Sequence, residues 1–294
     1  MPNRSATGRR SVLRGRTAVV TGAARGVGEA VARELASLGA KVALLGLEER
    51  ELARVSGALP TVSDHWHVDV TDDAAMARVA EEVRGRLGPA SVVVANAGLA
   101  EGGPFVDSDP ASWRRVIEVN LVGSAVTART FLPQLLDTRG HYLQIASLAS
   151  IGAAPLMSAY CASKAGVESF GHALRAELDP LGVGVGIAYL NWTDTDMIRD
   201  AAQHPVLREL RAHMPPPARR IYPATLVAHR LVRAVERRAP SVYVPGWLRG
   251  VQAVRAALPG IVTRFSRHEL TRSEFSATGL LGAGGRAEGA DGRR

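Results

Sequence analysis

Short apolar runs alternate with amphipathic stretches along most of the chain. The apolar runs are typical of strands buried on both faces of a sheet, and stretches with apolar residues at helical spacing are typical of helices that cover such a sheet. We expect strands near 17–21, 41–45, 65–69, 91–95, 141–146, 184–190 and 241–244. We expect helices near 26–38, 48–57, 72–87, 110–136, 158–179, 195–212, 224–237 and 247–257. The alternation predicts an α/β protein with a doubly wound parallel sheet of about seven strands and helices on both faces.

A glycine-rich turn lies between the first expected strand and the first expected helix. It contains Gly22, Gly26 and Gly28. Such a turn places a pyrophosphate on backbone amides at the N-terminus of a helix. We expect Gly22 to permit the turn, Gly26 to let the backbone approach the phosphates, and Gly28 to let the helix pack close to the strand. The turn therefore predicts a dinucleotide site.

Tyr160 and Lys164 lie four residues apart, so on a helix they share a face. A free tyrosine has a pKa of about 10, and a nearby ammonium group favours the phenolate and lowers that pKa. A phenol tuned in this way can exchange a proton with an alcohol or a carbonyl oxygen. Such a pair alone is more often an ordinary solvated pair, and the glycine turn is what favours a catalytic role.

Together with motifs that lie between them, these features resemble the signature of the short-chain dehydrogenase/reductase family. In chain order the motifs are Thr21-Gly22-x-x-x-Gly26-Val27-Gly28, Asp69-Val70, Asn96-Ala97-Gly98, Asn120, Ser147, and Tyr160 with Lys164. The resemblance covers roughly residues 15–200. It implies a single Rossmann-like domain, which we place at 15–250, and an oxidoreductase that uses NAD or NADP.

The resemblance implies two sets of site residues. The catalytic set is Asn120, Ser147, Tyr160 and Lys164. The cofactor-binding set, extended by two charged residues near the glycine turn and the second strand, is Gly22, Arg25, Gly26, Val27, Gly28, Glu48, Asp69, Val70, Asn96, Ala97, Gly98, Tyr160, Lys164 and Thr195. We expect no metal, because no Cys/His cluster has ligand spacing.

Each catalytic residue has an expected role in hydride transfer between nicotinamide and a ketone or secondary alcohol. Tyr160 exchanges the proton as general acid or base, and Ser147 hydrogen-bonds the reacting oxygen. Lys164 lowers the pKa of the tyrosine and, by resemblance, holds the nicotinamide ribose. Asn120 holds a water that links Lys164 to solvent. The cofactor supplies the hydride.

The choice between NAD and NADP depends on residues near the second strand. Gly46 stands where the family commonly has an acid that selects NAD, and Leu47 stands where it commonly has an arginine that selects NADP. Glu48 favours NAD if it reaches the adenosine ribose, whereas Arg25 would favour NADP by meeting a 2′-phosphate. The alternative for Glu48 is an acid that begins the next helix, where it suits the helix dipole. We expect NAD, because Glu48 is close and Leu47 is neutral.

Residues 191–223 are expected to form a lid over the substrate, because Pro205 and the run 215–217 break them into short pieces. Leu190 and Asn191 replace the Pro-Gly that the family usually has, so the family resemblance does not predict the backbone conformation here. The expected substrate pocket is lipophilic, and its candidate residues are Ser147, Leu156, Met157, Trp192, Met197 and Met214.

Two other functions remain open. A ketoreductase for carrier-bound 3-oxoacyl or polyketide chains has the same chemistry and needs a basic docking patch near the lid. The candidates for that patch are Arg208, Arg211, Arg219 and Arg220. A non-catalytic dinucleotide sensor predicts a damaged catalytic set, whereas the set here is complete.

The net charge of +8 is concentrated at the two ends of the 294-residue chain. We expect a disordered basic arm at 1–14, a helical extension at 251–270 and a disordered tail at 271–294. We expect no nucleic-acid partner, since no reading module is present and the aromatic content of 5% offers little for base stacking. The segment 247–265 is amphipathic and suits either subunit packing or contact with a membrane surface.

Location and assembly follow from weaker signals. Cys161 is the only cysteine, which fits a reducing compartment. Residues 1–16 lack the apolar core of a signal peptide, and no stretch of about 18 apolar residues would span a membrane. We therefore expect a cytoplasmic protein. The family resemblance implies a homodimer or homotetramer formed through helices 110–136 and 158–179.

Overall fold

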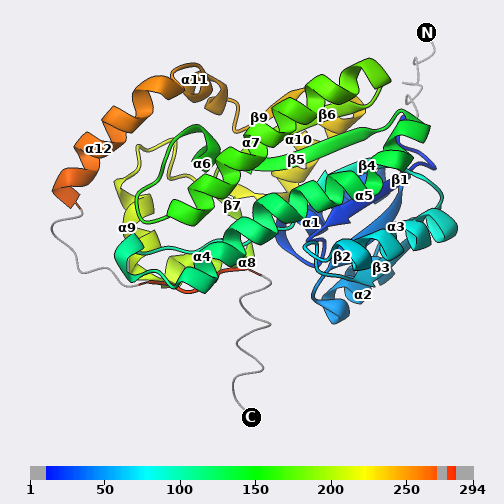
Figure 1. Ribbon diagram of the computed structural model, residues 1–294, viewed down its shortest axis with the longest axis horizontal. Helices are drawn as coiled ribbons and strands as arrows, with labels where there is room; N and C mark the ends of the chain where they lie inside the picture. The colour runs from blue at the N-terminus through cyan, green and yellow to red at the C-terminus, as the bar shows by residue number, and fades with distance from the viewer. Residues whose placement is uncertain (1–10, 270–276, 283–294) are drawn as a thin grey trace, which may run out of the picture.

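The structure is a computed structural model that describes residues 11–269 and 277–282. Its main sheet has seven strands, all parallel, in the order β3-β2-β1-β4-β5-β6-β9 (Figure 1). The strands are β1 (Thr17–Thr21), β2 (Lys41–Gly46), β3 (Ser63–His67), β4 (Ala90–Ala95), β5 (His141–Ser147), β6 (Gly184–Leu190) and β9 (Ser241–Val244). The predicted doubly wound parallel sheet is confirmed.

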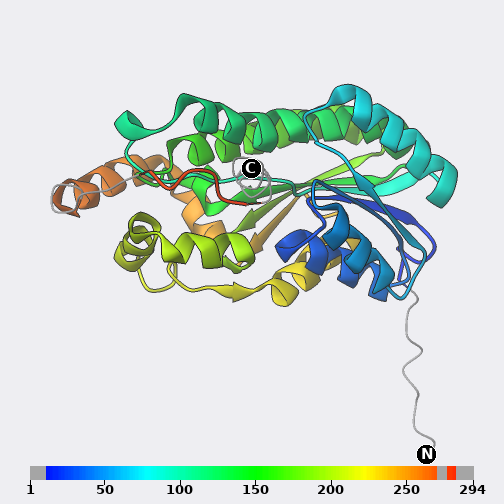
Figure 2. The ribbon, with the colours of Figure 1, turned by 90° about the horizontal axis from the view of Figure 1, so that it is seen from below.

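Helices cover both faces of the sheet, as Figure 2 shows from below. One face carries α1 (Gly26–Ser37), α2 (Glu49–Gly57) and α10 (Ala224–Glu236). The other carries α3 (Asp73–Leu87), α4 (Pro110–Ile117), α5 (Gly123–Thr138) and α7 (Ser158–Leu178). Successive side chains of a strand point to opposite faces of the sheet. On β5, Tyr142 packs on the face covered by α3, α4, α5 and α7, and Leu143 packs on the face covered by α1, α2 and α10.

The expected helix at 110–136 is two helices joined by a π-helical turn at Glu118–Val122. This turn contains the predicted site residue Asn120, which is 1% exposed. Single π-helical turns inside longer helices are frequent at functional sites. The irregular turn thus carries one of the predicted site residues.

The lid also differs from the expected single helix at 195–212. It contains α8 (Asp196–Gln203) and α9 (Pro205–His213). Pro205 ends the first helix because it has no N–H and forces the residue before it, His204, out of the helical conformation. A two-stranded sheet of β7 (Thr193–Asp194) and β8 (Tyr222–Pro223) closes the base of the lid.

The chain ends depart from the expected arm and tail. Within the expected arm, Leu13 is 3% exposed and packs in the core with α1 and α10. Two helices, α11 (Leu248–Ala253) and α12 (Leu258–Glu269), follow β9. Within the expected tail, residues 277–282 return to the body, where Leu281 pairs with Ala100. Residues 1–10, 270–276 and 283–294 lie outside the described residues.

No helix within the two described ranges is both long enough and apolar enough to cross a lipid bilayer.

Candidate active site

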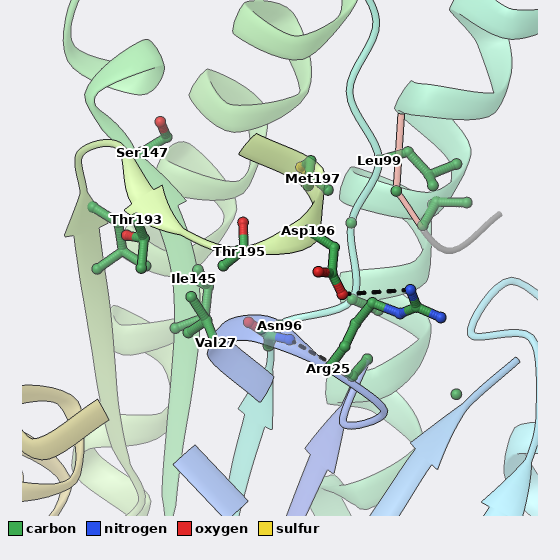
Figure 3. A pocket seen from close by; sticks show the side chains of 18 of the residues that line it. Arg25, Val27, Asn96, Leu99, Ile145, Ser147, Thr193, Thr195, Asp196 and Met197 are labelled. Carbon is green, nitrogen blue, oxygen red and sulfur yellow. Dashed lines mark hydrogen bonds and ion pairs between the residues drawn. The ribbon is translucent and has the colours of Figure 1, made fainter. Parts of the chain in front are cut away.

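The carboxyl ends of the central strands meet at one edge of the sheet, where they surround a cavity of about 210 Å³ (Figure 3). Parallel doubly wound sheets bind ligands at this edge. Most of the predicted site residues line this cavity. They are Gly22, Arg25, Gly26, Val27, Glu48, Asp69, Val70, Asn96, Ala97, Gly98, Ser147, Tyr160, Lys164, Thr195 and Met197.

The glycine turn has the conformation that its predicted role requires. Gly22 and Gly26 have φ values of +62° and +58°, which favour glycine. A β-carbon at Gly28 would lie 2.1 Å from the carbonyl oxygen of Gly22, so the start of α1 packs directly on the turn. Asn96 Nδ2 donates to the carbonyl oxygens of Thr21 and Gly22, at 3.0 and 3.2 Å. The result is a preformed cradle at a helix N-terminus, which fits a pyrophosphate.

Charged side chains line the cavity beside the glycine turn and the end of β2. Glu48, just after β2, forms an ion pair with Arg25. Arg25 also reaches Asp196 of the lid, at 3.5 Å, so its guanidinium connects the glycine turn to α8 (Figure 3). Asp69 accepts from the backbone N of Thr71 at 2.9 Å and pairs with Arg115. Burial raises the pKa of the Asp69 carboxyl, but these partners outweigh burial and lower it overall.

The predicted proton-transfer residues lie together on β5 and α7. Ser147 ends β5, and its hydroxyl accepts from the backbone N of Ala149 at 3.2 Å. On α7, the Lys164 ammonium lies 5.7 Å from the centre of the Tyr160 ring. Lys164 Nζ also donates to the carbonyl oxygen of Ile145 at 3.2 Å, and the residue is 5% exposed. The sheet therefore fixes the ammonium beside the phenol.

The electrostatics of this pair differ from the expectation that Lys164 lowers the pKa of Tyr160. Burial raises the pKa of Tyr160, while the Ser147 hydroxyl acts in the opposite direction. Burial also lowers the pKa of Lys164 to about 8. For the half-buried tyrosine the loss of hydration outweighs the effect of the Ser147 hydroxyl, whereas Lys164 is itself buried and loses hydration as well.

Asn120 does not line the cavity, and both its amide oxygen and its amide nitrogen form hydrogen bonds within the protein. Its Oδ1 accepts from the backbone N of Leu99 at 2.7 Å. Its Nδ2 donates to the carbonyl oxygen of Leu99 and to Ser163 Oγ, both at 2.9 Å. These bonds hold the loop that contains Gly98, whose β-carbon would lie 3.1 Å from Asn120 Oδ1. The water expected beside Asn120 stays a prediction.

Comparison with known proteins decides the family. Residues 16–205 match the family model described as short chain dehydrogenase. The chain belongs to the short-chain dehydrogenase/reductase family, a family of oxidoreductases.

Individual relatives agree with this assignment. A short chain dehydrogenase of Pseudocercospora fijiensis is 33% identical over 226 residues, which is 71% of each chain. A meso-2,3-butanediol dehydrogenase of Serratia marcescens is 34% identical over 58% of this chain and 67% of its own length. A crystal structure of a family member from Burkholderia phymatum in complex with NAD superposes with a TM-score of 0.73, at 27% identity, over 82% of this chain and 92% of that one.

The substrate side of this short-chain dehydrogenase/reductase is only partly as expected. Met157 and Met197 belong to an apolar cluster that also contacts Tyr160. Trp192 does not line the cavity, and its indole N–H points to the sulfur of Met214, 3.3 Å away. Trp192 thus packs within the lid in this structure, and its predicted place in the substrate pocket stays a prediction.

Three residues of the site were missed in the sequence. Asp196 holds Arg25. Asn191 donates to the carbonyl oxygens of Ala218 and Arg220, at 2.9 and 3.3 Å, and so ties the end of the lid to β6. Leu281 packs in the apolar cluster of the substrate side. Two of them had a signal: Asn191 stands where the family usually has Pro-Gly, and Leu281 is half of an apolar pair in a tail otherwise rich in Gly, Ala and Arg.

Proposed function

We propose that this protein is an NAD-dependent oxidoreductase that interconverts a lipophilic ketone and a secondary alcohol. One observation carries the proposal: Tyr160, Ser147 and Lys164 line the same cavity as the glycine cradle. A proton-transfer group and a dinucleotide site that share a cavity suit hydride transfer coupled to proton transfer. Membership of the family and the NAD bound to the relative from Burkholderia phymatum support it.

The residues of the chain divide the work. A dinucleotide held by the glycine cradle would supply or accept the hydride. During reduction Tyr160 donates its proton to the carbonyl oxygen, and during oxidation it takes the proton back. Ser147 donates a hydrogen bond to the same oxygen and stabilises the charge that develops there. Lys164 binds the ribose of the nicotinamide.

Glu48 supports NAD over NADP. Its carboxylate lies at the end of β2 and lines the cavity. A carboxylate there accepts hydrogen bonds from ribose hydroxyls and repels a 2′-phosphate. Arg25, the residue that would attract this phosphate, is paired with Glu48 and with Asp196. Titration of both reduced cofactors by fluorescence tests the preference, and tighter binding of NADPH would contradict it.

The activity itself is tested with a panel of ketones and secondary alcohols, followed at the absorbance of the reduced cofactor in both directions. Carrier-bound 3-oxoacyl chains belong in the panel, because a clear preference for them would favour the ketoreductase alternative. Dinucleotide binding without turnover of any compound would favour the sensor.

Tyr160→Phe tests the role of the phenol. Loss of the proton donor is expected to lower kcat by about a thousandfold, with little change in dinucleotide affinity. Tyr222→Phe is the control, because Tyr222 lies at the base of the lid in β8 and does not line the cavity. Near-normal turnover by Tyr160→Phe would refute the mechanism.

The homodimer or homotetramer, the cytoplasmic location and the membrane-surface contact stay predictions. Sedimentation of the purified protein tests assembly through α4, α5 and α7, and a monomer would contradict it.

A further inference from the structure

Residues 277–282, here called the strap, lie against the loop that follows β4. Ala100 and Leu281 exchange both backbone hydrogen bonds, at 3.0 and 2.7 Å. The backbone N of Thr278 donates to the carbonyl oxygen of Gly102 at 2.8 Å, and the backbone N of Gly102 donates to Thr278 Oγ1 at 2.9 Å. Figure 2 shows the strap in red between the helices of the upper layer and the lid. The strap is therefore held by specific hydrogen bonds.

Two glycines let the strap pass through a narrow place. A β-carbon at Gly103 would lie 2.7 Å from the Cα of Ala277. A β-carbon at Gly282 would lie 2.9 Å from Cε of Met197 and 3.3 Å from the carbonyl oxygen of Gly98. Both glycines have positive φ, +137° and +113°, which other residues rarely adopt. The strap thus crosses between the lid and the loop that carries Asn96-Ala97-Gly98.

Leu281 connects the strap to the reacting end of the cavity. It is 6% exposed, so its side chain is buried between the strap and the body of the protein. The apolar cluster around it combines the loop after β4, the lid and α7. Its other members are Ala100, Met157, Ala201 and Leu207, with Ala154, Tyr160, Cys161 and Met197 packed against them. The leucine and the Tyr160 ring therefore belong to one cluster.

We infer that Leu281, which packs behind the cavity wall, is a positioning residue that holds the strap and the side chains of Met197 and Tyr160 in place, and so limits the size of the apolar group a substrate can place beside Tyr160. Gly282 lines the cavity together with Ser147, Tyr160 and Met197, so the strap forms part of the cavity wall. An apolar wall selects substrates by shape, since it offers no charge or hydrogen bond. The inference rests on the proposed function and assigns the site to compact apolar ketones or alcohols.

Substrate selectivity tests the inference in the full-length protein. Leu281→Ala removes most of the side chain and is expected to raise kcat/KM for bulky alkyl ketones, relative to small ones, by about tenfold. The change should lie mainly in KM, and the affinity for NADH should stay the same. Leu280→Ala is the matched control, because Leu280 is the neighbouring leucine and packs against the core on the other side of the strap. An unchanged ratio for Leu281→Ala, or an equal shift for Leu280→Ala, would overturn the inference.

A cross-link tests the position of the strap without any need for turnover. Antiparallel residues that exchange both hydrogen bonds have Cα atoms about 5.5 Å apart, which is within the range of a disulfide. Ala100→Cys with Leu281→Cys, in a Cys161→Ser background, is expected to form a disulfide within one chain on mild oxidation. A covalent dimer, or no disulfide, would overturn the assignment of the strap to its own cavity.

The two experiments separate the inference from the proposed function. If the wild type turned over no ketone or alcohol, the proposed function would fail, and with it the role of Leu281 in selecting ketones. The cross-link would still report whether the strap is seated. If the wild type is active and the ratio does not move, only the role of Leu281 fails.

Discussion

The part of the cavity proposed for the cofactor, here called the cofactor half, and the part proposed for the substrate, the substrate half, are built in different ways. In the cofactor half, each group follows a strand end closely: Gly22 follows β1, Glu48 comes two residues after β2, and Asn96 follows β4. In the substrate half, one apolar cluster draws on the loop after β4, α7, the lid and the strap. Of its members, Ala100 and Leu281 are 181 residues apart in the chain and in direct contact.

This difference assigns separate tasks to the two halves. The cofactor groups follow strands that are hydrogen-bonded to a neighbouring strand on both sides. The position of these groups is therefore fixed, because the backbone next to them has almost no conformational freedom. The substrate groups depend on side-chain packing and on a few ties, such as Asn191 to the end of the lid. We therefore expect that changes in the lid or strap alter substrate affinity while dinucleotide affinity persists, and that changes in the glycine turn abolish both.

Gly28→Ala should have the largest effect and should destroy the cofactor half. The new methyl group would meet the carbonyl oxygen of Gly22 at 2.1 Å, and neither backbone can yield without moving the turn. Overpacking of this kind costs about 3 kcal/mol or more of folding stability, and displacement of the turn should separately lower dinucleotide affinity by about a hundredfold, equivalent to about 2.7 kcal/mol. Fluorescence titration and thermal unfolding measure the two losses.

Gly85→Ala is the matched control for Gly28→Ala. Gly85 lies on α3, and a β-carbon there would meet nothing within 4 Å. Alanine suits a helix interior better than glycine by about 1 kcal/mol, so this variant should be as stable as the wild type or more stable. Equal damage by both substitutions would show that the tight contact at Gly28 is not what matters.

The contrast between the halves also explains what could be predicted from the sequence. The order of strands and helices, the glycine turn and the Ser147, Tyr160 and Lys164 positions were recognisable, because each depends on neighbouring residues. Strand β3 was expected at 65–69 and lies at Ser63–His67, where it pairs with β2 from Val42↔Ser63 to Gly46↔His67. An edge strand with few apolar residues leaves its ends undefined in a sequence.

The substrate half was harder to predict because its contacts join distant segments. Trp192 was expected in the cavity, and only the position of Met214 in the folded lid explains why it points elsewhere. Asn191 looked like a departure from the family pattern, and only the placement of Ala218 and Arg220 gives it a function. No local pattern encodes such pairings.

Acid should weaken both halves together through His141, at the opposite edge of the sheet. His141 is 2% exposed, and burial together with Arg238 and Arg175 lowers its pKa to about 4. Between about pH 4 and 6.5 the unfolded chain binds the extra proton, so stability is fully present above this window and falls as the pH drops through it. We expect a loss of about 2–3 kcal/mol from about pH 7 to about pH 4.5, measured by urea unfolding.

A matched pair of variants isolates the histidine. His141→Gln cannot be protonated and should lose most of this pH dependence. His172→Gln should keep it, because the His172 side chain is 50% exposed on α7. If both variants kept the full acid sensitivity of the wild type, another group would be responsible.

Glu48→Gln should change the selectivity of the cofactor half without damaging it. The substitution removes the carboxylate that pairs with Arg25 and repels a 2′-phosphate, while Asp196 still pairs with the guanidinium. The ratio of the dissociation constants for NADPH and NADH should fall by about tenfold, equivalent to about 1.4 kcal/mol. Glu49→Gln is the control of equal charge, since Glu49 is exposed at the start of α2 and outside the cavity. The same shift in both variants would point to net charge alone.

Asn191→Ala should have the smallest effect and should confine it to the substrate half. It removes the two hydrogen bonds to the carbonyl oxygens of Ala218 and Arg220, which together are worth about 1–2 kcal/mol. With the lid held less firmly, KM for the substrate should rise about fivefold, while the affinity for NADH stays the same. Asn191→Asp keeps the size of the side chain but turns an acceptor toward two carbonyl oxygens, so its KM should rise further. An equal loss of NADH affinity in either variant would mean that the lid and the glycine turn act as one unit, because the ion pair between Arg25 and Asp196 would then transmit the change between the two halves.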